Sequence, residues 1–169
     1  MRKEEKNRTL VFANRFYYIT LSTRKNIPLF NETWVCDLFL HILMYNKYAL
    51  DYKVHGFVIL PDQVHLILYS PQVPVAQAIK KNTANFTRYY QKISGQSQFT
   101  PWDPDFTMVP IENADFYKKV RAYVHHTPVR KNLVATAGSF HYSSYRFYEG
   151  ERADFMLLLD AFSDEACSP

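Results

Sequence analysis

The sequence predicts an α+β fold of the ferredoxin-like (split βαβ) type, in which helices cover one face of an antiparallel sheet. Three observations support this class. The chain has 169 residues, of which 47% are hydrophobic, so one compact core can form. The spacing of its apolar residues changes between the period of a strand and that of a helix. These segments follow one another as strand, helix, two strands, helix and strand, with a further helix after them.

Four segments have the composition of strands. Residues 15–23 are rich in aromatic and β-branched side chains. Residues 54–60 and 64–69 are apolar runs separated by a short turn that begins with Pro61, which is typical of a hairpin. A fourth, short strand is expected over residues 106–111.

Three segments have helical periodicity. Residues 34–48 have apolar side chains at helical spacing, and residues 75–94 combine such a pattern with basic side chains. Asn113 is a suitable N-cap for a third helix. We expect this helix to end ahead of Pro128, because a proline disfavours the helical conformation of the residue before it. Periodicity then returns only at residues 155–162.

One domain is expected, and its charge suits a polyanion. Residues 15–150 form its body, between a charged segment, 1–14, and an acidic tail or helix, 151–169. Lys and Arg number 20 against 16 for Asp and Glu, which gives a net charge of +4. Because acidic residues gather in the tail, the body is more basic than this total, which favours nucleic acid as a partner.

Cysteine usage and hydropathy favour a cytoplasmic protein. Cys36 and Cys167 have neither the spacing of a metal site nor that of a disulfide framework. No apolar run approaches the roughly 18 residues of a membrane span, and the N-terminal residues lack the hydrophobic segment of a secretory signal. We therefore expect no association with a membrane.

The strand at residues 64–69 and its turn carry two polar groups on one surface. Successive side chains of a strand alternate between faces, so Gln63 and His65 project together while Val64 and Leu66 point into the core. A lone histidine in a strand is more often structural or exposed than a ligand, so His65 alone indicates no function.

The segment LPDQVHLIL, residues 60–68, resembles the second-strand signature of single-tyrosine HUH transposases. In that signature a proline-containing turn opens a His-hydrophobic-His motif. The motif in this chain is Gln63-Val64-His65, so a glutamine replaces the first histidine.

Later segments resemble the REP-associated branch of these transposases, in the same order. They include Pro101-Trp102, the run AYVHHTPVRKNLV and the run HYSSYRFY. In that branch the nucleophilic tyrosine comes five residues before the proline of an Asn-Pro-Val segment. Tyr123 has this place ahead of Pro128, and Thr127 replaces the asparagine. The resemblance spans residues 15–148.

The resemblance implies a tyrosine endonuclease and strand transferase that cuts DNA through Tyr123. It also implies a weakly bound divalent metal ion, Mg²⁺ or Mn²⁺, at His65 and Gln63, with Thr127 or His126 approaching from the tyrosine helix. A phenol with a pKa of about 10 is a poor nucleophile at neutral pH unless the phosphate is made more electrophilic, which a divalent ion achieves. The amide oxygen of Gln63 is an acceptable ligand for such a hard cation, although a weaker one than imidazole.

Single-stranded or hairpin DNA is the expected partner, and both a monomer and a homodimer are open. Basic side chains on two helices are candidate phosphate contacts, while each taken singly is also typical of a solvated helix face. Tyr89 or Tyr90 could stack on bases or belong to the core. The candidate DNA-binding residues are Lys80, Lys81, Arg88, Lys92, Lys118, Lys119, Arg130 and Lys131.

Two alternatives to a DNA-cleaving enzyme stay open. Because Gln63 and Thr127 replace the histidine and the asparagine of the family motifs, the chain could be a cleavage-deficient module that binds hairpin DNA. Tyr123 would then only pack on the sheet. The second alternative is an RNA-binding domain, which shares the ferredoxin-like topology. The glycine- and aromatic-rich central signature of such domains is missing, and the segment His55-Gly56-Phe57-Val58 resembles it only weakly.

Overall fold

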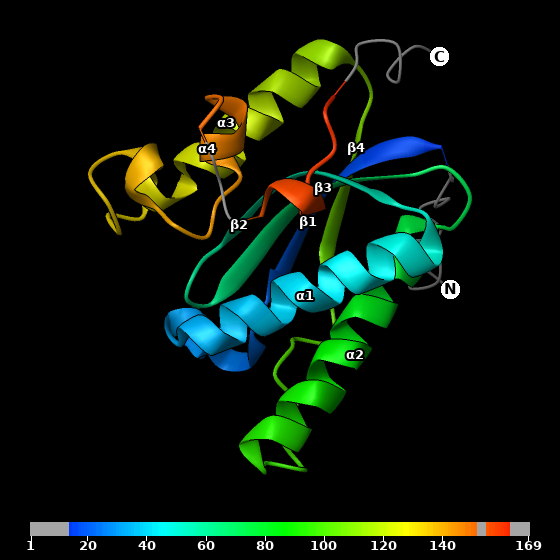
Figure 1. Cartoon of the computed structure of the whole chain (residues 1–169), viewed down its shortest axis with the longest axis vertical. Helices are drawn as coiled ribbons and strands as arrows, with labels where there is room; N and C mark the ends of the chain where they lie inside the picture. Colours follow the sequence, from blue (N-terminus) through cyan, green and yellow to red (C-terminus); the bar gives the residue numbers. More distant parts are fainter. Residues whose placement is uncertain (1–13, 152–154, 163–169) are drawn as a thin grey trace, which may run out of the picture.

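The structure is a computed structural model that describes residues 14–151 and 155–162, and it contains one four-stranded antiparallel sheet (Figure 1). The strands are β1 (Arg15–Ser22), β2 (Lys53–Ile59), β3 (Gln63–Ser70) and β4 (Thr107–Ile111). They lie in the order β2-β3-β1-β4. This is the order of a split βαβ sheet, and the predicted fold class is confirmed.

Two helices cover one face of the sheet, as predicted. They are α1 (Thr33–Leu50) and α2 (Val75–Ser94), which lie side by side in Figure 1. Val64, Leu66 and Leu68 point from β3 into the core beneath these helices and are fully buried. None of the helices in the described ranges is both long and apolar enough to cross a bilayer.

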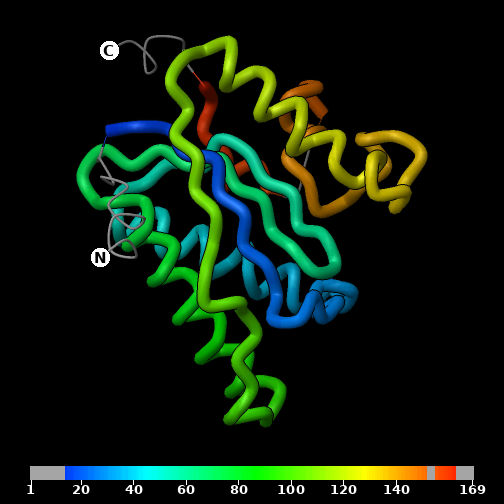
Figure 2. Tube along the Cα trace, turned by 180° about the vertical axis from the view of Figure 1, so that it is seen from behind, coloured from blue at the N-terminus to red at the C-terminus, as the bar shows by residue number. Residues whose placement is uncertain are grey.

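The last long helix lies on the other face of the sheet (Figure 2). This helix, α3 (Ala114–Arg130), packs Tyr117, Val120 and Val124 against Phe16 and Ile67. The expectation that all helices share one face is therefore corrected for α3. Phe16 and Ile67 give the second face of the sheet its own apolar surface, and an amphipathic helix covers it.

The end of α3 also differs from the prediction. The helix continues through Pro128 to Arg130 rather than ending ahead of the proline. Pro128 lies in the last turn, and beyond it the backbone N–H of Lys131 donates to the carbonyl of Thr127. Because Pro128 removes just one hydrogen bond near the helix end, the helix tolerates it there.

Residues 155–162 contact the first half of the outer edge of β2, the edge that does not pair with β3. Leu159 forms a parallel bridge with Val54, and the Asp160 carboxylate accepts hydrogen bonds from the Val54 backbone at 2.9 Å and the Lys47 ammonium group at 2.8 Å. Phe162 stacks on Tyr117 with ring centroids 3.7 Å apart. The other parts of the expected tail, 152–154 and 163–169 with Cys167, and the N-terminal residues 1–13 lie outside the described residues.

Candidate functional site

Tyr123 lies on α3, and its ring faces the second face of the sheet. Its side chain is 47% exposed. Its ring stands edge-on to the ring of His65, with centroids 6.4 Å apart, and to that of Tyr18, at 6.0 Å. The structure therefore brings the predicted nucleophile next to one predicted metal ligand.

His65 is buried beneath this tyrosine. Its Nδ1 atom lies 2.6 Å from the hydroxyl of Tyr18 and 3.2 Å from that of Thr20. Its Nε2 atom is buried and has no hydrogen-bond partner in the described part of the chain. Burial, followed by the charges of Lys131 and Arg130, lowers the pKa of His65 to about 4. The imidazole is consequently neutral at physiological pH, and its buried Nε2 atom makes no hydrogen bond within the described residues.

Gln63 shares the face of β3 with His65, as the strand alternation predicts, but its oxygen is already engaged. The Nζ atom of Lys131 donates to Gln63 Oε1 at 3.2 Å. The same ammonium group lies 3.5 Å from the carboxylate of Asp62 in the turn before β3. A side-chain cation thus occupies the position next to Gln63 at which a metal ion was expected.

Thr127 has a similar arrangement on α3. Its hydroxyl donates to the backbone carbonyl of Tyr123 at 2.7 Å and accepts from Arg130 at 2.6 Å. The guanidinium group of Arg130 also lies over the ring of Tyr123, 3.9 Å from its centroid. Tyr123, Thr127 and Arg130 therefore form one contact group on the last turns of the helix.

The two neighbouring histidines of α3 point away from this group. His126 is exposed and faces the ring of Tyr145, with centroids 6.0 Å apart. His125 is buried and its Nε2 atom lies 2.8 Å from the hydroxyl of Ser144. Of the two ligands expected from the tyrosine helix, the structure thus brings Thr127 and not His126 toward Tyr123.

These donors fit a divalent ion only in part. The unpartnered Nε2 atom of His65 could bind one, whereas the oxygens of Gln63 and Thr127 already accept hydrogen bonds from Lys131 and Arg130. Across residues 14–151 and 155–162, no three His, Cys, Asp or Glu side chains come together as a metal cluster would. Mg²⁺ or Mn²⁺ stays a prediction.

The eight candidate DNA-binding residues fall into two groups, because α2 and α3 cover opposite faces of the sheet. Lys80, Lys81, Arg88 and Lys92 are all exposed on α2, while Lys118, Lys119, Arg130 and Lys131 are exposed on or just after α3.

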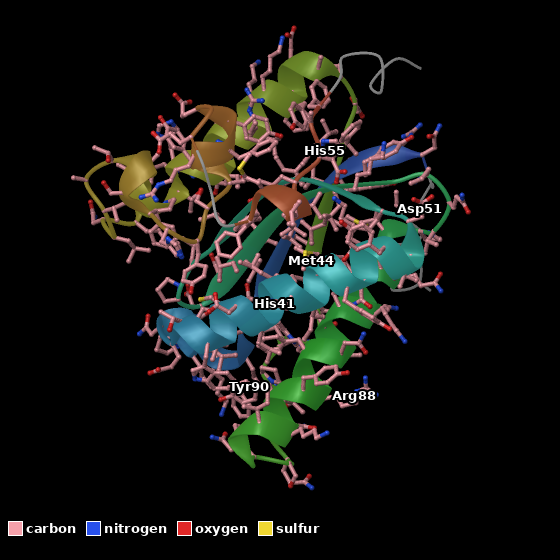
Figure 3. All side chains as sticks on the ribbon, in the orientation of Figure 1. His41, Met44, Asp51, His55, Arg88 and Tyr90 are labelled. Atoms are coloured by element: carbon pink, nitrogen blue, oxygen red, sulfur yellow. The ribbon has the colours of Figure 1, made fainter. Side chains whose placement is uncertain are left out.

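The aromatic candidates on α2 differ in burial. Arg88 and Tyr90 leave the helix on different sides (Figure 3), and Tyr90 is only 7% exposed, whereas Tyr89 is 42% exposed. The ring of Tyr89 lies 5.0 Å from the guanidinium carbon of Arg88. Tyr89 is therefore available for stacking and Tyr90 belongs to the core.

No family model and no curated protein matches the chain, but solved structures do. A REP-associated tyrosine transposase bound to a REP hairpin matches with a TM-score of 0.72 and 16% identity, covering 93% of this chain and 94% of that one. A protein from Deinococcus radiodurans R1 that is described as a transposase matches with a TM-score of 0.51 and 16% identity, covering 88% and 98%. The chain has the fold of the tyrosine transposases. The resemblance seen in the sequence motifs is thereby confirmed at the level of the fold.

Within this transposase fold, the sequence did not reveal three residues around the site. Tyr18 and Thr20 come from β1 and contact His65, and Asp62 pairs with Lys131. The alternation of β1 indicates that Tyr18 and Thr20 share a face, but only the register, which pairs Thr20 with His65, shows that this face is the site. Asp62 was visible in the sequence only as part of a turn.

Proposed function

We propose that the chain binds single-stranded or hairpin DNA and cleaves it through Tyr123. The observation that carries this proposal is the exposed Tyr123 ring beside the buried, unpartnered Nε2 atom of His65, with Arg130 over the ring. The matching REP-associated transposase was bound to a DNA hairpin, which supports DNA as the ligand. Exposed lysines on the same helix could neutralise further phosphates.

The proposed chemistry is an in-line transfer of one phosphodiester. The Tyr123 oxygen forms a bond to phosphorus while the bond to the 3′ oxygen of the upstream nucleotide breaks, which leaves a 5′-phosphotyrosine and a free 3′-hydroxyl. The phenol loses one proton and the 3′ oxygen gains one. The tyrosyl phosphodiester keeps the energy of the broken bond for rejoining, so no nucleotide cofactor is needed. Positive charge near the phosphate would stabilise the negative charge that develops on its oxygens.

A binding module without cleavage is the second candidate, and one observation favours it. The side-chain oxygens of Gln63 and Thr127 accept hydrogen bonds from Lys131 and Arg130. The two residues that depart from the transposase motifs are thus also the two predicted metal ligands whose oxygens are already engaged. Such a protein would still hold hairpin DNA. The RNA-binding alternative has little support, because Phe57, its aromatic candidate, is fully buried and cannot stack on a base.

Replacing Tyr123 by phenylalanine tests the nucleophile. We expect the parent to form a covalent adduct with members of a single-stranded hairpin library and Tyr123→Phe to form none, while hairpin affinity stays within about twofold because only the hydroxyl is lost. Adducts are measured on denaturing gels and affinity by fluorescence anisotropy.

Tyr89→Phe is the matched control, because Tyr89 is similarly exposed but lies on α2. An adduct that persists in Tyr123→Phe would exclude this nucleophile. Hairpin binding by the parent without any adduct would establish the binding module instead. The absence of hairpin binding would contradict both proposed functions.

A further inference from the structure

Two side-chain cations lie where the sequence predicts the oxygen ligands of a metal ion. Lys131 donates to Gln63 Oε1 at 3.2 Å, and Arg130 donates to Thr127 Oγ1 at 2.6 Å. Both cations come from the end of α3, within eight residues of Tyr123. The two oxygens thus already contact positive charge that is covalently part of the chain.

The hydrogen bonds around His65 favour an N–H group at Nε2. The Thr20 hydroxyl donates to the Tyr18 hydroxyl oxygen at 3.2 Å, which leaves the proton of Tyr18 for another acceptor. The Nδ1 atom of His65 lies only 2.6 Å from that hydroxyl. If Nδ1 accepts this proton, the hydrogen of the neutral ring sits on Nε2. A metal ligand needs a lone pair at this atom, whereas an N–H group binds an anionic oxygen.

The charge on this surface is positive. Within the described residues Arg130 has no carboxylate partner, and Lys131 forms an ion pair with one carboxylate, that of Asp62, at 3.5 Å. A guanidinium group offers several N–H donors in a plane, which suits the two unesterified oxygens of a phosphodiester. Arg130 lies 3.9 Å from the centroid of the Tyr123 ring, so a phosphate that it holds would be close to the phenol.

We propose that Arg130, Lys131 and the Nε2–H group of His65 form a binding site for one DNA phosphodiester that needs no divalent ion. This inference rests on the proposed function, because it names the groups that hold the phosphate next to Tyr123. It assigns Lys131 and Arg130 the electrostatic role for which Mg²⁺ or Mn²⁺ was predicted.

Histidine NMR can test this site without requiring cleavage. The full chain is labelled with ¹⁵N-histidine, and the signals of His65 are assigned through its contact with the Tyr18 ring. We expect its ¹⁵N shifts to report a hydrogen on Nε2, and titration with the dinucleotide thymidylyl-thymidine in EDTA to shift that signal to saturation. Lys131→Met and Arg130→Met should each weaken this binding about tenfold, whereas Lys131→Arg should keep it within about threefold.

Lys53→Met is the control, because it removes an exposed lysine that pairs with Tyr69, at the other end of the β2–β3 ladder from Gln63. An unprotonated Nε2, a dinucleotide response that appears only with Mn²⁺, or no response at all would overturn the proposal. Hairpin affinity of the same samples, measured by anisotropy, separates the two claims. A dinucleotide response without hairpin binding would reject the proposed function and keep the phosphate site.

Discussion

At the scale of single residues, three buried histidines link folding to pH. Burial is the main cause that lowers the pKa of His55 and His65 to about 4 and that of His125 to about 3. The unfolded chain binds these protons with an ordinary pKa of about 6.5. The contribution of each neutral ring is therefore fully present above pH 6.5. It is lost as pH falls toward the folded pKa of that histidine, by at most about 1.4 kcal/mol per pH unit per histidine.

Replacing His55 or His125 by leucine tests this linkage at one imidazole without a hydrogen bond and at one with a hydrogen bond. Neither ring nitrogen of His55 has a hydrogen-bond partner among the described residues, so His55→Leu should leave the free energy of unfolding at pH 7 within about 1 kcal/mol of the parent. His125→Leu loses a hydrogen bond with Ser144 and should cost about 1 to 2 kcal/mol. Both variants should flatten the loss of stability between pH 6.5 and 4.5 in denaturant titrations. A parental slope in either variant would contradict the assigned pKa.

At the scale of elements, local patterns predicted most of the fold, while the face covered by α3 depended on distant contacts. The helix predicted over residues 75–94 is α2, and both hairpin strands lie within a residue or two of their expected ends. Nothing local shows which face of the sheet α3 covers, because Phe16 and Ile67 make the second face apolar only once β1 and β3 pair. The rule for residues before a proline failed at Pro128 because the last turn of a helix has little hydrogen bonding left to lose.

The start of α3 offers a prediction about one element. The side chain of Asn113 accepts a hydrogen bond from the backbone N–H of Phe116 at 2.8 Å, as its predicted role as N-cap requires. Asn113→Ala should lower the free energy of unfolding by about 1 kcal/mol, measured by urea denaturation. Glu112→Ala, an exposed neighbour outside the helix, should stay within about 0.5 kcal/mol. Equal effects of the two substitutions would mean that the cap contributes nothing specific.

At the scale of the whole molecule, the candidate site is assembled from segments that are far apart in the chain. Strand alternation predicted that Gln63 and His65 share a face, and the transposase resemblance nominated Tyr123. The hydrogen bond from Lys131 to Gln63 spans 68 positions, so it depends on α3 crossing the second face of the sheet. The same crossing separates the basic residues of α3 from those of α2, which no count of charges along the sequence could show.

This separation predicts that the two basic groups contribute unequally to DNA binding. Because Tyr123 lies on the α3 side, a hairpin held there should contact Lys118 and Lys119 rather than Lys80 and Lys81 across the sheet. Neutralising one phosphate contact changes the slope of log K against log salt by about 0.9 for duplex DNA. The double substitution Lys118→Gln with Lys119→Gln should therefore reduce the magnitude of the slope by up to about 1.8.

The matched double substitution of Lys80 and Lys81 by glutamine removes the same charge from α2 and should leave the slope unchanged. Anisotropy titrations at four or more salt concentrations measure both slopes, and circular dichroism checks that the variants fold. Net charge acts on all DNA equally at long range, so equal losses in the two variants would indicate nonspecific attraction. A loss only in the α2 variant would move the DNA to the other face of the sheet, away from Tyr123, and with it contradict cleavage by this residue.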